Sequence, residues 1–134
     1  MHTCTHALIR CMDFRLQKAI DEYMTVNNLV GDCDMISVAG VGKDIIANPD
    51  GFVATQVSLS KKLHDTKTVL LIHHMDCGAY GGHDAFESRE AEKNFQIEEM
   101  KKAAIIIIEK QPGMVVKMLL ADHLEDGSFK VVEV

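Results

Sequence analysis

The chain has 134 residues, of which 47% are hydrophobic and 25% charged, a balance that is typical of a folded globular protein and excludes a disordered one. Its length predicts one domain over residues 1–134, large enough to build a core without disulfides or a structural metal. Lys and Arg number 14 against 20 Asp and Glu, and the resulting net charge of −6, with no basic tract, argues against binding to nucleic acid or to an anionic membrane.

The first half of the chain predicts strands that alternate with helices. Residues 5–10 form a short, mostly apolar strand, and residues 35–39 a second strand that ends in a glycine-rich turn. Asn48-Pro49-Asp50 is typical of a helix start, and residues 68–72 (TVLLI) have the continuous apolar character of a buried parallel strand. After the first strand, apolar side chains recur at the spacing of one helix face, at Leu16, Ala19, Ile20, Tyr23 and Met24.

The second half predicts one long helix and two further strands. The helix carries apolar residues at helical spacing between 100 and 108 and is stopped by Pro112-Gly113. Residues 114–121 form another strand, and Asp126-Gly127 ahead of residues 129–134 indicates a hairpin with an antiparallel edge strand. We therefore expect an α/β fold with a mostly parallel sheet, strand order 2-1-3-4 with strand 5 at the antiparallel edge, flanked by helices.

The sequence also predicts where the protein resides. Its longest purely apolar run, residues 103–108, is far too short to span a membrane, and the start MHTCTH lacks the features of a signal peptide, so we expect a cytoplasmic protein. In that reducing compartment the cysteines are better interpreted as thiols or metal ligands than as disulfides: Cys4, Cys11, Cys33 and Cys77.

Metal-ligating side chains follow the first and third predicted strands. Cys11-Met12-Asp13-Phe14-Arg15 ends the first, and His73-His74-Met75-Asp76-Cys77-Gly78 ends the third. If these strands are neighbours in a parallel sheet, Cys11 lies beside the His74-x-x-Cys77 turn. Two thiolates and one imidazole suit Zn²⁺, and three protein ligands with one further position are typical of a catalytic zinc.

The two motifs together, CxDxR and HxxCG, with a glycine turn after the second strand, resemble the β-class carbonic anhydrases. In that family Cys, His and Cys bind zinc, and the Asp and Arg of the first motif form a dyad beside the metal. The resemblance implies that Cys11, His74 and Cys77 are the zinc ligands of this chain and that Asp13 and Arg15 are its catalytic dyad.

The resemblance further implies a zinc lyase that interconverts CO₂ and bicarbonate by means of zinc-bound hydroxide. Asp13 would orient that hydroxide while Arg15 clamps the carboxylate; alternatively, Asp13 would itself occupy the fourth zinc position and close the site. Two other functions remain open. One is hydrolysis of a CO₂ analogue, carbonyl sulfide or carbon disulfide, on the same fold, and the other is a non-catalytic zinc-binding or regulatory role.

Some positions depart from the family pattern. Ser37-Val38-Ala39-Gly40 stands where the family often has Arg-Asn-Ala-Gly, and His73 replaces a small residue. Ten residues precede Cys11, where family members generally carry a helical arm that packs on a partner subunit. We expect a twofold homodimer, or a higher even oligomer, with the metal sites near the shared surface, where apolar residues gather: Phe14, Val41, Phe52, Tyr80 and Phe86.

Other candidate ligands receive simpler interpretations. His2, Cys4 and His6 alternate along an extended segment and could bind a metal from one face, but we favour a frayed terminus. His73 is expected to be a satisfied buried polar group rather than a proton acceptor. The segment Gly40-Val41-Gly42-Lys43-Asp44 fails as a phosphate-binding loop, although its amides could contact a small anion. We assign no role to Cys33, His64, His83 and His123.

Overall fold

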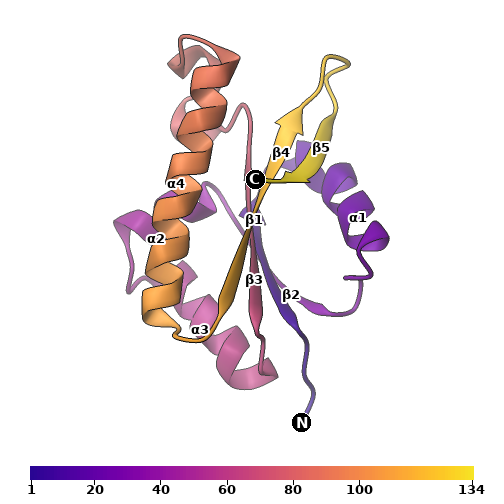
Figure 1. Ribbon diagram of the computed structural model, residues 1–134, viewed down its shortest axis with the longest axis vertical. Coiled ribbons are helices and arrows are strands. Elements are labelled where there is room, and N and C mark those ends of the chain that lie inside the picture. Colours follow the sequence, from indigo (N-terminus) through magenta and orange to yellow (C-terminus); the bar gives the residue numbers. More distant parts are fainter.

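Five strands form one sheet in the order β2-β1-β3-β4-β5 in the computed structural model, which describes residues 1–134 (Figure 1). The strands are β1 (His6–Cys11), β2 (Cys33–Val38), β3 (Thr68–His74), β4 (Val115–His123) and β5 (Phe129–Glu133). β1 pairs in parallel with β2 and β3, β3 pairs in parallel with β4, and β5 runs antiparallel to β4. The predicted α/β class, strand order and antiparallel edge are confirmed.

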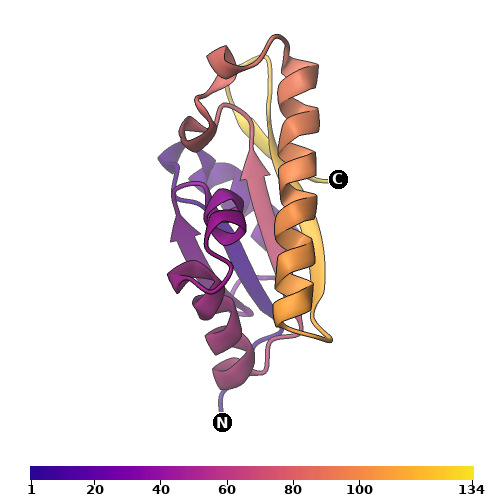
Figure 2. The same cartoon turned by 90° about the vertical axis from the view of Figure 1, so that its left-hand side faces the viewer.

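The helices cover the sheet on both faces. The α-helices are α1 (Gln17–Val26), α2 (Val41–Ala47), α3 (Phe52–His64) and α4 (Arg89–Lys110), and the short 3₁₀ turns are η1 (Phe14–Leu16), η2 (Gly78–Tyr80) and η3 (His83–Ala85). Figure 1 shows α1 on one side of the sheet and α2, α3 and α4 on the other, and Figure 2 shows α4 running the length of its side. None of these helices combines the length and the apolar character needed to cross a membrane.

The core lies around the two central strands. All but the first residue of β1 and of β3 are buried, because these strands have neighbours on both edges and helices on both faces. The four consecutive isoleucines, residues 105–108, lie in the helix α4 and do not form a strand. Ile107 is buried with Met100 and Ala103, whereas Ile105 and Ile108 are exposed, which is the alternation that a period of 3.6 residues produces.

The short helix α2 was not predicted from the sequence, which indicated only a glycine turn after β2. Gly40 adopts a left-handed conformation with φ of 58°, and a Cβ atom there would lie 2.6 Å from the Cβ of Ala79. Because glycine has no Cβ, it allows both this backbone conformation and the close approach of the η2 segment. The helix then begins directly at Val41, and its buried residues are Val41, Gly42 and Ile45.

The start of the chain is held in place from Cys4 onward. The backbone N–H of Cys4 donates to the carbonyl of His64 (3.1 Å), and the N–H of Thr5 donates to Oδ1 of Asp32 (2.7 Å). The carbonyl of Thr5 accepts from the amide of Thr68 as well. The expected frayed terminus is thus wrong for Cys4 and His6, because backbone pairing continues ahead of β1.

A glycine-to-alanine change in α2 tests how tightly the helix is packed. A Cβ at Gly42 would lie 2.0 Å from Nε2 of the buried His73 side chain. Although alanine is favoured in helices, this clash should lower the free energy of unfolding by about 1–3 kcal/mol in Gly42→Ala, measured by urea denaturation. Gly78→Ala is the matched control, because nothing lies within 4 Å of the added atom. Equal stability of the two variants would contradict the packing described for α2.

Candidate metal centre

Three metal-ligating side chains meet at the carboxyl ends of the central strands. Cys11 ends β1, His74 ends β3, and Cys77 follows in the turn before η2. One donor atom from each lies within 4.8 Å of the other two, and all three residues are buried. The parallel pairing of β1 with β3 produces this meeting, because it brings the ends of both strands to the same edge of the sheet.

The His74 ring is oriented as a metal-binding imidazole requires. Its Nδ1–H donates to the carbonyl of Met75 (2.8 Å), and since a carbonyl can only accept, the proton must sit on Nδ1. Nε2 is left with a free lone pair, and this atom is buried with no hydrogen-bond partner. A buried nitrogen without a partner costs stability, and a metal ion between the two sulfurs would satisfy it. The residues present therefore fit a zinc ion.

The two thiols form a coupled pair. Hydrogen bonding to the Cys77 thiol lowers the pKa of Cys11 to about 3 against the opposing effect of burial, and His74 and the backbone amides of Gly40 and Asp13 lower it further. The same interaction with Cys11, together with burial, raises the pKa of Cys77. The two sulfur atoms lie within 4.8 Å of one another beside the His74 ring. A cation in that place would stabilise both as thiolates.

Asp13 and Arg15 form a bidentate ion pair beside the cluster of Cys11, His74 and Cys77. Arg15 donates from Nη2 to Oδ2 of Asp13 (2.7 Å) and from Nε to Oδ1 (3.0 Å). The guanidinium is anchored on its other side, because Nη1 donates to Oδ2 of Asp76 (2.8 Å) and Nη2 to the carbonyl of Asp76 (3.0 Å). Hydrogen bonds from Arg15 lower the pKa of Asp13 to about 2, so the carboxylate stays ionised at neutral pH.

The carboxylate of Asp13 is turned toward Arg15. Both of its oxygens accept hydrogen bonds from that residue, and Asp13 is not among the side chains whose donor atoms gather with Cys11. The structure therefore has three clustered donors with an ionised carboxylate nearby, and not four.

Comparison with known proteins identifies the relationship. The model of a family described as "Putative carbonic anhydrase" matches residues 1–133. The chain belongs to this family. It is also similar to two proteins described as uncharacterised, from Rickettsia bellii and Rickettsia conorii, each 28% identical over 120 residues. These alignments cover 84% of this chain and 73% and 64% of the respective relatives, so the chain spans only part of their length.

In this carbonic anhydrase family member, sequence reasoning missed the buried residue that shapes the first motif. Arg10 lies at 8% exposure in β1, where it donates from Nε to the carbonyl of Cys11 (2.6 Å) and from Nη2 to that of Asp13 (2.7 Å). A charged residue inside an otherwise buried strand was the available signal. Arg10 fixes the backbone that carries Cys11 and Asp13.

A second missed residue supports the HxxCG turn of this carbonic anhydrase family member. Glu92 in α4 is 1% exposed, and its Oε1 accepts from the backbone N–H of Asp76 (2.5 Å) while Oε2 pairs with Nδ1 of His83. The backbone N–H of His83 donates in turn to Oδ1 of Asp76 (2.9 Å). This network holds the carboxylate that anchors Arg15. His83, to which no role was assigned, belongs to the support of the turn.

His73 and Gln96 border the candidate metal ligands on the side of α4. Nδ1 of His73 pairs with Oε1 of Gln96 (2.9 Å), whereas Nε2 of His73 and Nε2 of Gln96 have no partner. Burial lowers the pKa of His73, which keeps the ring neutral. The expectation of a satisfied buried histidine is met at one nitrogen only. A cavity of about 10 Å³, large enough for about one water, lies between these side chains and the metal ligands.

The glycine segment after β2 contacts the η2 turn and the thiol pair. Nζ of Lys43 donates to the carbonyl of Ala79 (2.6 Å) and lies 5.4 Å from the centre of the Tyr80 ring. The backbone amide of Gly40 is directed at Cys11. Lys43 is thus engaged within the fold, and a contact between the amides of this segment and a small anion stays a prediction.

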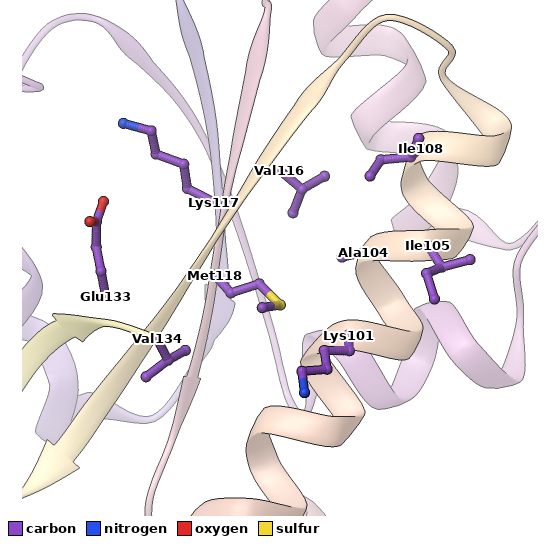
Figure 3. Close-up of a pocket in the computed structure, with 9 residues that line it drawn as sticks. All are labelled: Lys101, Ala104, Ile105, Ile108, Val116, Lys117, Met118, Glu133 and Val134. Atoms are coloured by element: carbon purple, nitrogen blue, oxygen red, sulfur yellow. The ribbon is translucent and has the colours of Figure 1, made fainter.

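An apolar groove lies away from these residues. It has a volume of about 510 Å³ between α4 and β4, and Figure 3 shows apolar side chains of both elements facing it. Its lining includes no cysteine, histidine or hydroxyl nucleophile. The groove therefore lacks the side chains that would make it a metal site or a nucleophilic centre.

Proposed function

We propose that this chain is a β-class carbonic anhydrase, a zinc lyase that catalyses the reversible hydration of CO₂ to bicarbonate. The observation that carries the proposal is the unpartnered, buried Nε2 of His74, which faces two cysteine sulfurs beside an arginine-clamped carboxylate. Family membership over residues 1–133 supports the same activity. Cys11, His74 and Cys77 would hold the zinc, and Asp13 and Arg15 would act beside it.

Zinc bound by these three residues would supply an activated water as the nucleophile. Two thiolates and a neutral imidazole cancel the charge of a divalent ion, so the protein must help to polarise that water. Asp13 would take this task, because its carboxylate stays ionised and is fixed by Arg15. The carboxylate would accept a hydrogen bond from the nucleophile and orient it toward CO₂.

The decisive experiment is stopped-flow CO₂ hydration by zinc-loaded protein from about pH 7 to about 9. Hydration above the buffer rate that disappears on zinc removal is the expected result. Parallel assays with carbonyl sulfide and carbon disulfide separate the alternative substrates. A zinc-loaded protein that is inactive on all three would contradict the proposal and indicate a metal-binding protein without catalysis.

We also propose a twofold homodimer with the metal sites near the shared surface. Phe14, which lies between the dyad residues, is 77% exposed, and Phe52 at the start of α3 is 75% exposed. The expected apolar set is smaller than the sequence indicated, because Val41 is in the core and Tyr80 and Phe86 pack against Phe95. Large exposed aromatic side chains beside a reactive site are typical of an interface.

A charge placed on Phe14 should break this dimer. In Phe14→Asp, a carboxylate would be buried without a partner in the interface, and sedimentation equilibrium at micromolar concentration should show a monomer. Ile108→Asp is the matched control, because Ile108 is exposed on the groove of Figure 3. A monomeric parent protein, or a dimer that only Ile108→Asp disrupts, would contradict the proposed interface.

A further inference from the structure

A second group of metal-ligating side chains lies at the opposite end of the sheet from the proposed zinc centre. Cys4 precedes β1, Asp34 is the second residue of β2, and His64 is the last residue of α3. One donor atom from each is within 4.8 Å of the other two, and all three side chains are half-buried. Figures 1 and 2 show the N-terminus at this end, beside the end of α3.

The backbone around this group is fixed. The backbone hydrogen bond from Cys4 to His64 (3.1 Å) joins the two residues directly. Asp34 belongs to a paired strand, and Oγ of Ser60 donates to its Oδ2 (2.6 Å) and lies 3.1 Å from Oγ1 of Thr66. The donors are thus brought together by three different segments, each held by its own hydrogen bonds.

The charges around the group favour a cation. Nδ1–H of His64 donates to Oδ1 (2.8 Å) and Oδ2 (2.7 Å) of Asp34, and neither Lys nor Arg pairs with this carboxylate. Asp32 lies two residues before it in sequence and pairs with His6 and with the backbone N–H of Thr5, neither of which is a lysine or an arginine side chain. A divalent ion between these side chains would offset the negative charge of the two carboxylates.

We propose that Cys4, Asp34 and His64 form a second metal site, for Zn²⁺, that is independent of the catalytic centre. Sulfur, carboxylate oxygen and imidazole nitrogen are all zinc ligands. The ring of His2, whose centre lies 4.9 Å from that of His64, is available as a fourth donor. Because the three ligands belong to different segments, a bound ion would cross-link the chain start, β2 and α3. The role of the site is therefore stabilisation of this end of the fold, with lower affinity than at the buried centre.

The test uses protein in which the first centre is disabled by Cys77→Ser, so that its outcome does not depend on the proposed enzymatic activity. The stripped protein is titrated with Co²⁺, followed by thiolate-to-metal charge-transfer absorption, and with Zn²⁺ by calorimetry. We expect one ion per chain with a sulfur ligand, and a higher Tm with Zn²⁺ present. Circular dichroism checks that each variant is folded.

Adding Cys4→Ser should remove the charge-transfer band and weaken Zn²⁺ binding by more than about 10-fold. Asp34→Asn should weaken Zn²⁺ binding by a similar factor while keeping the hydrogen bond from Ser60. Cys33→Ser is the control and should bind as the parent does, since Cys33 lies outside the cluster. Absence of binding at millimolar Zn²⁺, or binding that survives Cys4→Ser, would overturn the proposal.

Discussion

Cys77→Ser is expected to abolish tight zinc binding and, with it, CO₂ hydration. Cys77 is buried, and serine is close to it in size, so the fold should persist while a thiolate ligand is lost. Changes to residues that merely orient a ligand cost about 10–100-fold in metal affinity, so removing a ligand should cost at least about 100-fold. Zinc content after dialysis against a chelator, together with stopped-flow hydration, measures both effects.

The matched control is Cys33→Ser, examined like Cys77→Ser in a Cys4→Ser background so that the N-terminal site does not contribute. Cys33 belongs to neither cluster of metal-ligating side chains, so its replacement removes no proposed ligand. The control should keep its zinc and its activity. Full zinc retention by the Cys77 variant would remove the basis of the ligand assignment.

The strand order could be predicted because its signals are local. Residues 68–72 are continuously apolar, as a strand with neighbours on both sides must be, and Asp126-Gly127 marks the single antiparallel return. Once β1 and β3 are placed side by side, Cys11 and His74 must end at the same edge. The clustering of the three donor residues could therefore be predicted from the sequence.

The residues that hold the site in place could not be predicted from the sequence, because their contacts join segments that are distant in the chain. Glu92 reaches Asp76 from the first turns of α4, and no spacing in the sequence indicates that this helix passes the HxxCG turn. The pairing of Cys4 with Asp34 and His64 likewise needs the register of β1 against β2. The helix α2 was missed because Gly40 directly before it and Gly42 in its first turn are unfavourable for a helix of only seven residues.

Asp13→Asn should leave zinc bound and reduce CO₂ hydration by about 100-fold or more, the range in which a positioned acid or base contributes. The amide of asparagine keeps the shape of the side chain but carries no charge and offers one acceptor oxygen in place of two. It can no longer accept both hydrogen bonds that Arg15 donates at present, to Oδ1 and to Oδ2. The nucleophile would then lose both its acceptor and the orientation that the clamp provides.

Arg15→Lys tests the clamp itself, because an ammonium keeps the positive charge without the planar fork. Arg15 bridges Asp13 and Asp76 with separate nitrogens, and lysine cannot reproduce that geometry, so hydration should fall while zinc content stays constant. Asp50→Asn makes the same change as Asp13→Asn at an exposed surface pair with Lys110 and should leave the rate unaltered. If Asp13→Asn hydrates CO₂ as fast as Asp50→Asn at equal zinc content, the carboxylate of Asp13 has no part in the reaction. The lower hydration rate predicted for Arg15→Lys would then have no explanation, because Arg15 acts by holding that carboxylate.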